Sequence, residues 1–177
     1  MEDNYVKLAK KAVRKAVAGK NDAELDRLRK EIPDEQRGVF VTIKTLDGDL
    51  RGCIGTYTPA TESLDREIIR NASSAALEDP RFPPVKEEEL DELILSVDVL
   101  SEPEDCDRAD LDPSRYGVIV SKGRKSGLLL PDLEGVDTVE RQLEVTKRKA
   151  GIAPGDKNFT LQRFEVERHE GENPIGT

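Results

Sequence analysis

The stretch GVFVTIKTLDGDLRGCIGT, residues 38–56, decides the fold. Apolar and polar residues alternate over residues 39–43, which is the period of a β-strand with one buried face. Asp47-Gly48 is a strong signal for a tight turn between two strands. The stretch therefore predicts a β-hairpin whose second arm is formed by residues 49–56.

The second arm of this hairpin carries the candidate site. In a regular strand, Leu50 and Ile54 face the core, and Arg51 and Cys53 project together from the opposite face. A guanidinium beside a thiol favours the thiolate, which is the nucleophilic form of cysteine. We therefore predict that Arg51 lowers the pKa of Cys53, and both are candidate catalytic residues. The competing interpretation is that Cys53 packs as a small apolar residue, as free cysteines often do.

Two glycines and a short rigid loop add candidate substrate-binding residues. Gly52 and Gly55 weaken a strand interior, so they indicate a bulge or the close approach of a ligand or another backbone segment. The segment Asp79-Pro80-Arg81-Phe82 ends a predicted helix. It either presents Arg81 and Phe82 to a pocket or locks two elements together. Gly52, Gly55, Arg81 and Phe82 are therefore candidates for substrate binding.

The remaining chain alternates irregularly between helical and strand patterns. Apolar residues at three- and four-residue steps predict helices over residues 5–17, 21–33 (starting at Asn21), 61–79 and 138–150. Period-two patterns predict further strands over residues 93–99, 116–121, 127–130 and 159–168, the last with a bulge. This order predicts an α+β fold of mixed or antiparallel sheets, with hairpins covered by helices, rather than a doubly wound parallel sheet.

Composition narrows the class of protein. The 177 residues carry a formal charge of −9, which argues against nucleic-acid binding because that depends on Lys and Arg neutralising phosphates. A basic helix face at residues 7–15 is the surface on which such binding would fall. No apolar run approaches the roughly 18 residues of a membrane span, and the acidic start is unlike a secretory signal. We therefore expect a cytoplasmic protein with no membrane partner.

The cysteine and histidine content predicts no metal site and no bound cofactor. Cys53 and Cys106 are far apart in sequence, and His169 is the single histidine, which does not match zinc or iron–sulfur ligation. A Cys53–His169 pair would require the C-terminal tail to fold back onto the hairpin, and we do not expect it. Carboxylates beside Cys106 should raise its pKa, so we predict that this thiol is inert.

Several segments together resemble the AMMECR family, whose microbial members are called AmmeMemoRadiSam system protein A. The similarity extends from about Tyr5 to Phe164. It implies a single AMMECR-type domain over residues 1–177, built from two closely packed, interwoven lobes with the cysteine segment near a cleft between them. The segments are Leu50-Arg51-Gly52-Cys53-Ile54-Gly55, Asp79-Pro80-Arg81-Phe82, Ser96-Val97-Asp98-Val99-Leu100 and Gly127-Leu128-Leu129-Leu130-Pro131.

The resemblance also implies partners, although it supplies no settled reaction. In microbes the family is linked by gene neighbourhood to a radical S-adenosylmethionine protein and a Memo-like protein. Two functions remain open. One is an accessory or ligand-binding protein of that system with a Cys-containing cleft. The other is a thiolate-dependent enzyme or group carrier that acts through Cys53 on a small anionic substrate. No oligomeric state follows from the sequence.

Overall fold

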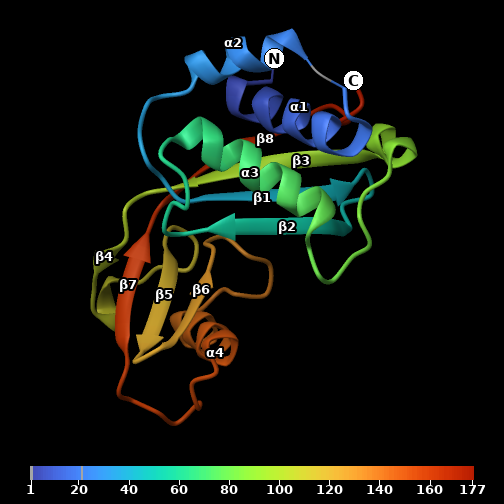
Figure 1. Cartoon of the computed structure of the whole chain (residues 1–177). Helices are drawn as coiled ribbons and strands as arrows, with labels where there is room; N and C mark the ends of the chain where they lie inside the picture. Colours follow the sequence, from blue (N-terminus) through green and yellow to red (C-terminus); the bar gives the residue numbers. More distant parts are fainter. Residues whose placement is uncertain (1, 21) are drawn as a thin grey trace. The chain divides into compact units, whose positions relative to one another are not determined.

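The computed structural model describes residues 2–20 and 22–177, which separate into two compact units. One unit contains the chain up to Val99 together with Glu167–Thr177, and the other contains Leu100–Val166. Each unit has its own four-stranded antiparallel sheet with helices (Figure 1). The chain therefore has the predicted α+β fold. In sequence, the second unit is an insertion between two strands of the first.

The first unit is a sheet with the strand order β2-β1-β3-β8 and helices on one face. Helix α3 packs on β1 and β2 and against α1 (Figure 1). The elements are α1 (Asn4–Ala18), α2 (Ala23–Glu31), β1 (Val39–Thr45), β2 (Leu50–Thr56), α3 (Leu64–Leu77), η1 (Glu87–Glu92), β3 (Leu93–Leu100) and β8 (Val166–Glu170). Asn21, predicted to start the second helix, lies outside the described residues. Asp22 is the N-cap of α2.

The second unit is a sheet with the strand order β4-β7-β5-β6, and helix α4 packs on β5 and β6. Its core contains Val118, Val120, Leu129 and Leu143. The elements are β4 (Glu104–Asp105), η2 (Arg108–Asp110), β5 (Gly117–Lys122), β6 (Lys125–Leu129), α4 (Val139–Ala150) and β7 (Thr160–Phe164). Helix α4 ends at Gly151, whose φ of 71° suits the left-handed conformation of a helix C-cap.

The hairpin predicted from residues 38–56 is confirmed. Val39, Val41 and Ile43 of β1 are fully buried. The chain reverses at Asp47-Gly48, where Gly48 has a φ of 94° and its N–H donates to the carbonyl of Thr45.

Among the described residues, no helix combines the length and apolarity needed to cross a membrane.

The predicted burial of Leu50 is wrong, because β2 contains a bulge. Ile43 pairs with Gly52, but the next β1 residue, Lys44, pairs with Leu50, so Arg51 is the extra residue. A bulge of one residue moves the side chains beyond it to the other face of the sheet. Leu50 consequently shares the solvent-facing side with Lys44 and is 39% exposed, whereas Ile54 packs partly buried against the core.

The single last strand predicted over residues 159–168 is also wrong, because this segment forms two strands in different sheets. β7 pairs with β5 and β4, and β8 is the edge neighbour of β3. In place of the expected bulge, the chain passes from one sheet to the other at Glu165, between the two strands. A change of sheet also interrupts a period-two pattern, so the sequence signal alone does not distinguish it from a bulge.

The close approach of the α3 backbone explains why residue 52 is a glycine. Gly52 lies on the side of β2 that faces α3, and a Cβ placed on it would be 2.2 Å from the carbonyl oxygen of Ala75. No side chain fits at that separation unless the helix moves. The absence of a side chain at Gly52 therefore sets how closely α3 packs on the sheet.

We predict that Gly52→Ala destabilises the first unit by about 1–3 kcal/mol, since overpacking a tight contact forces the backbone to shift. The measurement is urea-induced unfolding. Gly155→Ala is the control, because a Cβ there meets no atom within 4 Å and its φ is not positive. The control should change stability by less than about 0.5 kcal/mol. Equal stability of Gly52→Ala and wild type would contradict this account of the packing.

Candidate functional site

Cys53 lies on β2 with its thiol on the face of the sheet opposite α3. It pairs across the hairpin with Thr42, which alternates with the buried Val41 and Ile43 on β1. The Cys53 Sγ and the Thr42 Oγ1 are 3.3 Å apart. The thiol is therefore half-buried on the polar face of the first unit, as the strand pattern predicted for this residue.

The peptide of Cys53 is held by the loop that follows α3. β2 is an edge strand, so alternate N–H and C=O groups of its backbone point away from the sheet. The Cys53 N–H donates to the Asp79 carboxylate at 2.9 Å, and the Cys53 carbonyl accepts from the Arg81 guanidinium at 3.4 Å. The Asp-Pro-Arg segment thus covers the sheet edge beside the cysteine and locks α3 to β2.

Asp79 is the centre of this contact. It is 5% exposed and accepts the Arg81 N–H at 3.0 Å and the guanidinium at 3.0 and 2.7 Å. Hydrogen bonds from the Arg81 side chain outweigh the effect of burial and, with the Cys53 N–H, hold the pKa of Asp79 well below its usual range. Arg81 in turn lies 5.5 Å from the centre of the Phe82 ring, so the predicted pair Arg81 and Phe82 forms one cluster with Asp79.

The prediction that Arg51 lowers the pKa of Cys53 is wrong. Burial raises the pKa of the Cys53 thiol, and the Thr42 hydrogen bond and the Arg81 charge only oppose this effect. The Arg51 guanidinium instead donates to both oxygens of Glu89, at 2.9 and 3.1 Å, and to the Pro83 carbonyl at 3.0 Å. The bulge at Arg51 interrupts the alternation that would have placed it beside the thiol.

The Phe40 ring, which packs over Gly55, explains why residue 55 is also a glycine. Gly55 pairs with Phe40 across the hairpin, and a Cβ on Gly55 would lie 2.2 Å from the Phe40 ring. An aromatic ring lying over a cross-strand glycine compensates for the missing side chain in a sheet. Gly52 and Gly55 are thus explained by packing without a ligand, and their role in substrate binding stays a prediction.

A small hollow opens on the same sheet face as the thiol. Its volume is about 160 Å³, and Thr42, the hydrogen-bond partner of Cys53, forms part of its wall. Residues of β1 and β3 and the end of β8 line it: Thr42, Lys44, Ile94, Leu95, Ser96, Glu170 and Gly171. No pattern in the sequence brings these three strands together, because β8 is separated from β1 by about 120 residues of chain.

The AMMECR1 family model matches residues 6–169 of the chain. The chain belongs to the AMMECR1 family. A Thermotoga maritima protein is 49% identical over 171 residues, which cover 96% of this chain and 98% of that protein. A Clostridium acetobutylicum protein is 50% identical over 171 residues, but this chain spans only 36% of its length. The crystal structure of an uncharacterized Pyrococcus horikoshii protein, 36% identical, matches with a TM-score of 0.85 over 98% of this chain and 92% of that one.

His169 is not a partner of Cys53 in this AMMECR1-family chain. β8 and β2 are the opposite edges of the sheet, and His169 points to the helix side, where it stacks on Tyr5 with the rings 4.0 Å apart. Its Nδ1 is 2.6 Å from the Asp3 carboxylate. His169 therefore connects the last strand to the start of α1 and does not contact Cys53.

Cys106 lies in the second unit, partly buried against its core. Burial is the largest cause of its raised pKa, and the charges of Asp110, Asp107 and Glu104 add to it. The predicted direction is confirmed, although burial rather than the carboxylates dominates. Within the described part of the chain, no group of three or more His, Cys, Asp or Glu residues could hold a metal ion.

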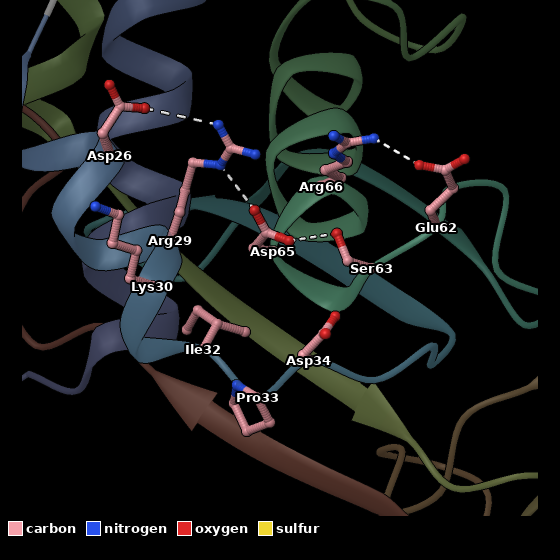
Figure 2. A pocket seen from close by; sticks show the side chains of 10 residues that line it. All are labelled: Asp26, Arg29, Lys30, Ile32, Pro33, Asp34, Glu62, Ser63, Asp65 and Arg66. Atoms are coloured by element: carbon pink, nitrogen blue, oxygen red, sulfur yellow. Dashed lines mark hydrogen bonds and ion pairs between the residues drawn. The ribbon is translucent and has the colours of Figure 1, made fainter.

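A larger hollow, which the sequence did not indicate, lies between α2 and the start of α3 (Figure 2). Its volume is about 740 Å³. Charged side chains of both signs surround it and largely pair among themselves. Arg29 forms an ion pair with Asp65 at 2.7 Å, and Arg66 forms one with Glu62 at 2.9 Å.

The basic face predicted at residues 7–15 is partly neutralised by ion pairs. Lys10 pairs with Glu2, and Lys11 pairs with Asp22 and Glu24.

We predict that Asp79→Asn lowers the free energy of unfolding by about 1.5–3 kcal/mol at neutral pH, because hydrogen bonds to a charged group are lost. Since folding lowers the Asp79 pKa, its contribution is present above the unfolded pKa of about 3.9 and is lost as the pH falls below that value. The difference from wild type should therefore shrink between about pH 5 and about pH 3. Glu88→Gln, on the exposed surface, is the control. A difference independent of pH would contradict the assignment.

Proposed function

We propose that this protein is a binding component, with its ligand site on the polar sheet face around a protonated Cys53. The observation that carries the proposal is the thiol's position. Its side-chain hydrogen bond goes to Thr42, which also lines the 160 Å³ hollow. Burial raises the pKa of the thiol, so at neutral pH Cys53 is a neutral group that supports the site wall through Thr42. A neutral thiol is a weak nucleophile but a normal packing and hydrogen-bonding group.

The proposal extends to an accessory role in a radical S-adenosylmethionine-associated system of the cytoplasm. Membership of the AMMECR1 family and the complete Arg-Gly-Cys-Ile-Gly segment support this step. The proposed partners are a radical S-adenosylmethionine protein and a Memo-like protein. In this role the protein positions a ligand or a partner and leaves the radical chemistry to them.

The alternative, a thiolate-dependent enzyme or group carrier, has one observation in its favour. The Arg81 charge lowers the pKa of Cys53, as a guanidinium that activates a thiol would. Burial outweighs that charge, and among the described residues no histidine or carboxylate makes a hydrogen bond to the Sγ. The alternative therefore lacks the base that such a nucleophile uses.

We predict that Cys53 in the native protein is alkylated slowly at neutral pH, with an apparent pKa above the free-cysteine value of about 8.5. The measurement is competitive alkylation over a pH series, with each cysteine followed by mass spectrometry. Arg81→Gln should raise the apparent pKa further, because it removes the opposing charge, while Arg70→Gln, on the exposed side of α3, should leave it unchanged. Rapid alkylation at neutral pH with an apparent pKa below 8.5 would favour the thiolate enzyme.

We further predict that the protein forms a stable complex with the radical S-adenosylmethionine protein or the Memo-like protein of the proposed system. The complex should survive Cys53→Ala, because a binding component does not need a reactive thiol. Co-elution on size exclusion with light scattering is the measurement, and Cys106→Ala is the matched control. Loss of the complex in Cys53→Ala but not in Cys106→Ala would point to chemistry at the thiol, and no complex with either partner would refute the accessory role.

A further inference from the structure

The hollow beside Cys53 is built by four side chains in a square on one sheet face. Thr42 and Lys44 are two residues apart on β1, and Ser96 and Ile94 are two residues apart on β3. Thr42 pairs with Ser96, and Lys44 pairs with Ile94. Directly paired residues of antiparallel strands have neighbouring side chains on the same face. Two hydroxyls therefore lie at one end of the square, and an ammonium and an apolar side chain lie at the other.

Glu170 completes the wall from β8. The Gly171 N–H donates to the Leu95 carbonyl at 2.9 Å, which attaches the end of β8 beside β3. Glu170 is two residues from Arg168, and Arg168 binds the buried Asp98 on the polar face. Side chains two residues apart in a strand share a face. A carboxylate from β8 therefore borders the same hollow as the Lys44 ammonium.

The two opposite charges that line the hollow are not paired with other charged groups of the described chain. In the described part of the chain, neither the Lys44 ammonium nor the Glu170 carboxylate makes a hydrogen bond or an ion pair, with each other or with another residue. Elsewhere in the unit, Lys10 and Arg168 have carboxylate partners. The hollow thus presents one free cation and one free anion, separated by more than the 4.0 Å of an ion pair.

The size and charge of the hollow limit its ligand. Its 160 Å³ is close to that of an engineered cavity of about 150 Å³ that holds benzene, so a nucleotide does not fit. A dicarboxylate would be repelled by Glu170, and a diamine would be repelled by Lys44. A molecule with one group of each charge meets a complementary charge at both ends. The two hydroxyls add hydrogen bonds, and Ile94 offers a small apolar contact.

We propose that this hollow binds a small zwitterion of the α-amino-acid class, with its carboxylate on Lys44 and its ammonium on Glu170. The proposal rests on the proposed function, for which it names the ligand. The hydroxyls of Thr42 and Ser96 line the same hollow and are available for further hydrogen bonds to the carboxylate or the ammonium of the ligand. Among the described residues, Cys53 reaches this site through its hydrogen bond to Thr42, so its thiol is a positioning group for that hydroxyl and not a catalytic residue.

The test is titration of the full-length protein with glycine, alanine and serine, followed by amide chemical shifts in ¹⁵N spectra. At least one should saturate at millimolar concentration or below and shift the amides of Thr42, Ser96 and Gly171. The N-acetyl and carboxamide derivatives each lack one charge and should bind at least about tenfold more weakly. Absence of saturation by all three amino acids, or shifts confined to other residues, would overturn the proposal.

Charge variants make the test specific. Lys44→Glu and Glu170→Lys should each reduce affinity at least about tenfold, and the double variant should recover binding because a zwitterion fits in the reverse direction. Glu88→Gln should bind like wild type. Unchanged binding in both single variants would overturn the assignment. If no amino acid binds but Cys53 keeps its raised pKa and the partner complex forms, this inference fails alone. Rapid Cys53 alkylation without a complex would remove the proposed function itself.

Discussion

The buried carboxylate of Asp79 is the interaction on which the arrangement around Cys53 depends. An ionised carboxylate is costly to bury, so it persists only where donors replace its water. Arg81 and the Cys53 N–H supply those donors. Because Asp79 follows α3 and Cys53 lies on β2, their bond fixes the end of the helix on the edge strand. The close approach of α3 at Gly52 completes the same contact from the core side.

A second buried carboxylate fixes the C-terminal end of β2. Glu67 of α3 is fully buried and accepts from the N–H groups of Ala60 and Thr61 and from the hydroxyls of Thr56 and Thr61. Burial raises its pKa, but these hydrogen bonds outweigh burial, so the pKa is lowered. Charged groups of α3 and of the loop that follows it therefore hold β2 at its middle, through Cys53, and at its C-terminal end, through Thr56. The apolar residues of the same helix supply the packing between them.

This anchoring divides the first unit's sheet into two faces with different chemistry. One face packs against α1 and α3 and contributes the core. The other carries Cys53, the Asp98–Arg168 pair and the hollow lined by Thr42 and Ser96. A thiol on such a face is shielded enough to stay protonated and near enough to polar groups to orient a hydroxyl. That combination suits ligand binding better than nucleophilic attack, which requires the thiolate.

The sequence by itself determined β1, the turn at Gly48, the main helices and the side of the sheet to which Cys53 points. Each is set by a local period or by a residue whose backbone preference is decisive. Only the tertiary structure decided that Arg51 binds Glu89, that the last segment changes sheets, and that Lys44 and Glu170 border one hollow. The bulge in β2 depends on pairing with β1, and the other contacts join residues 38 or more positions apart. Local periodicity carries no information about which distant side chains meet, because that is decided by how the packed elements bring them together.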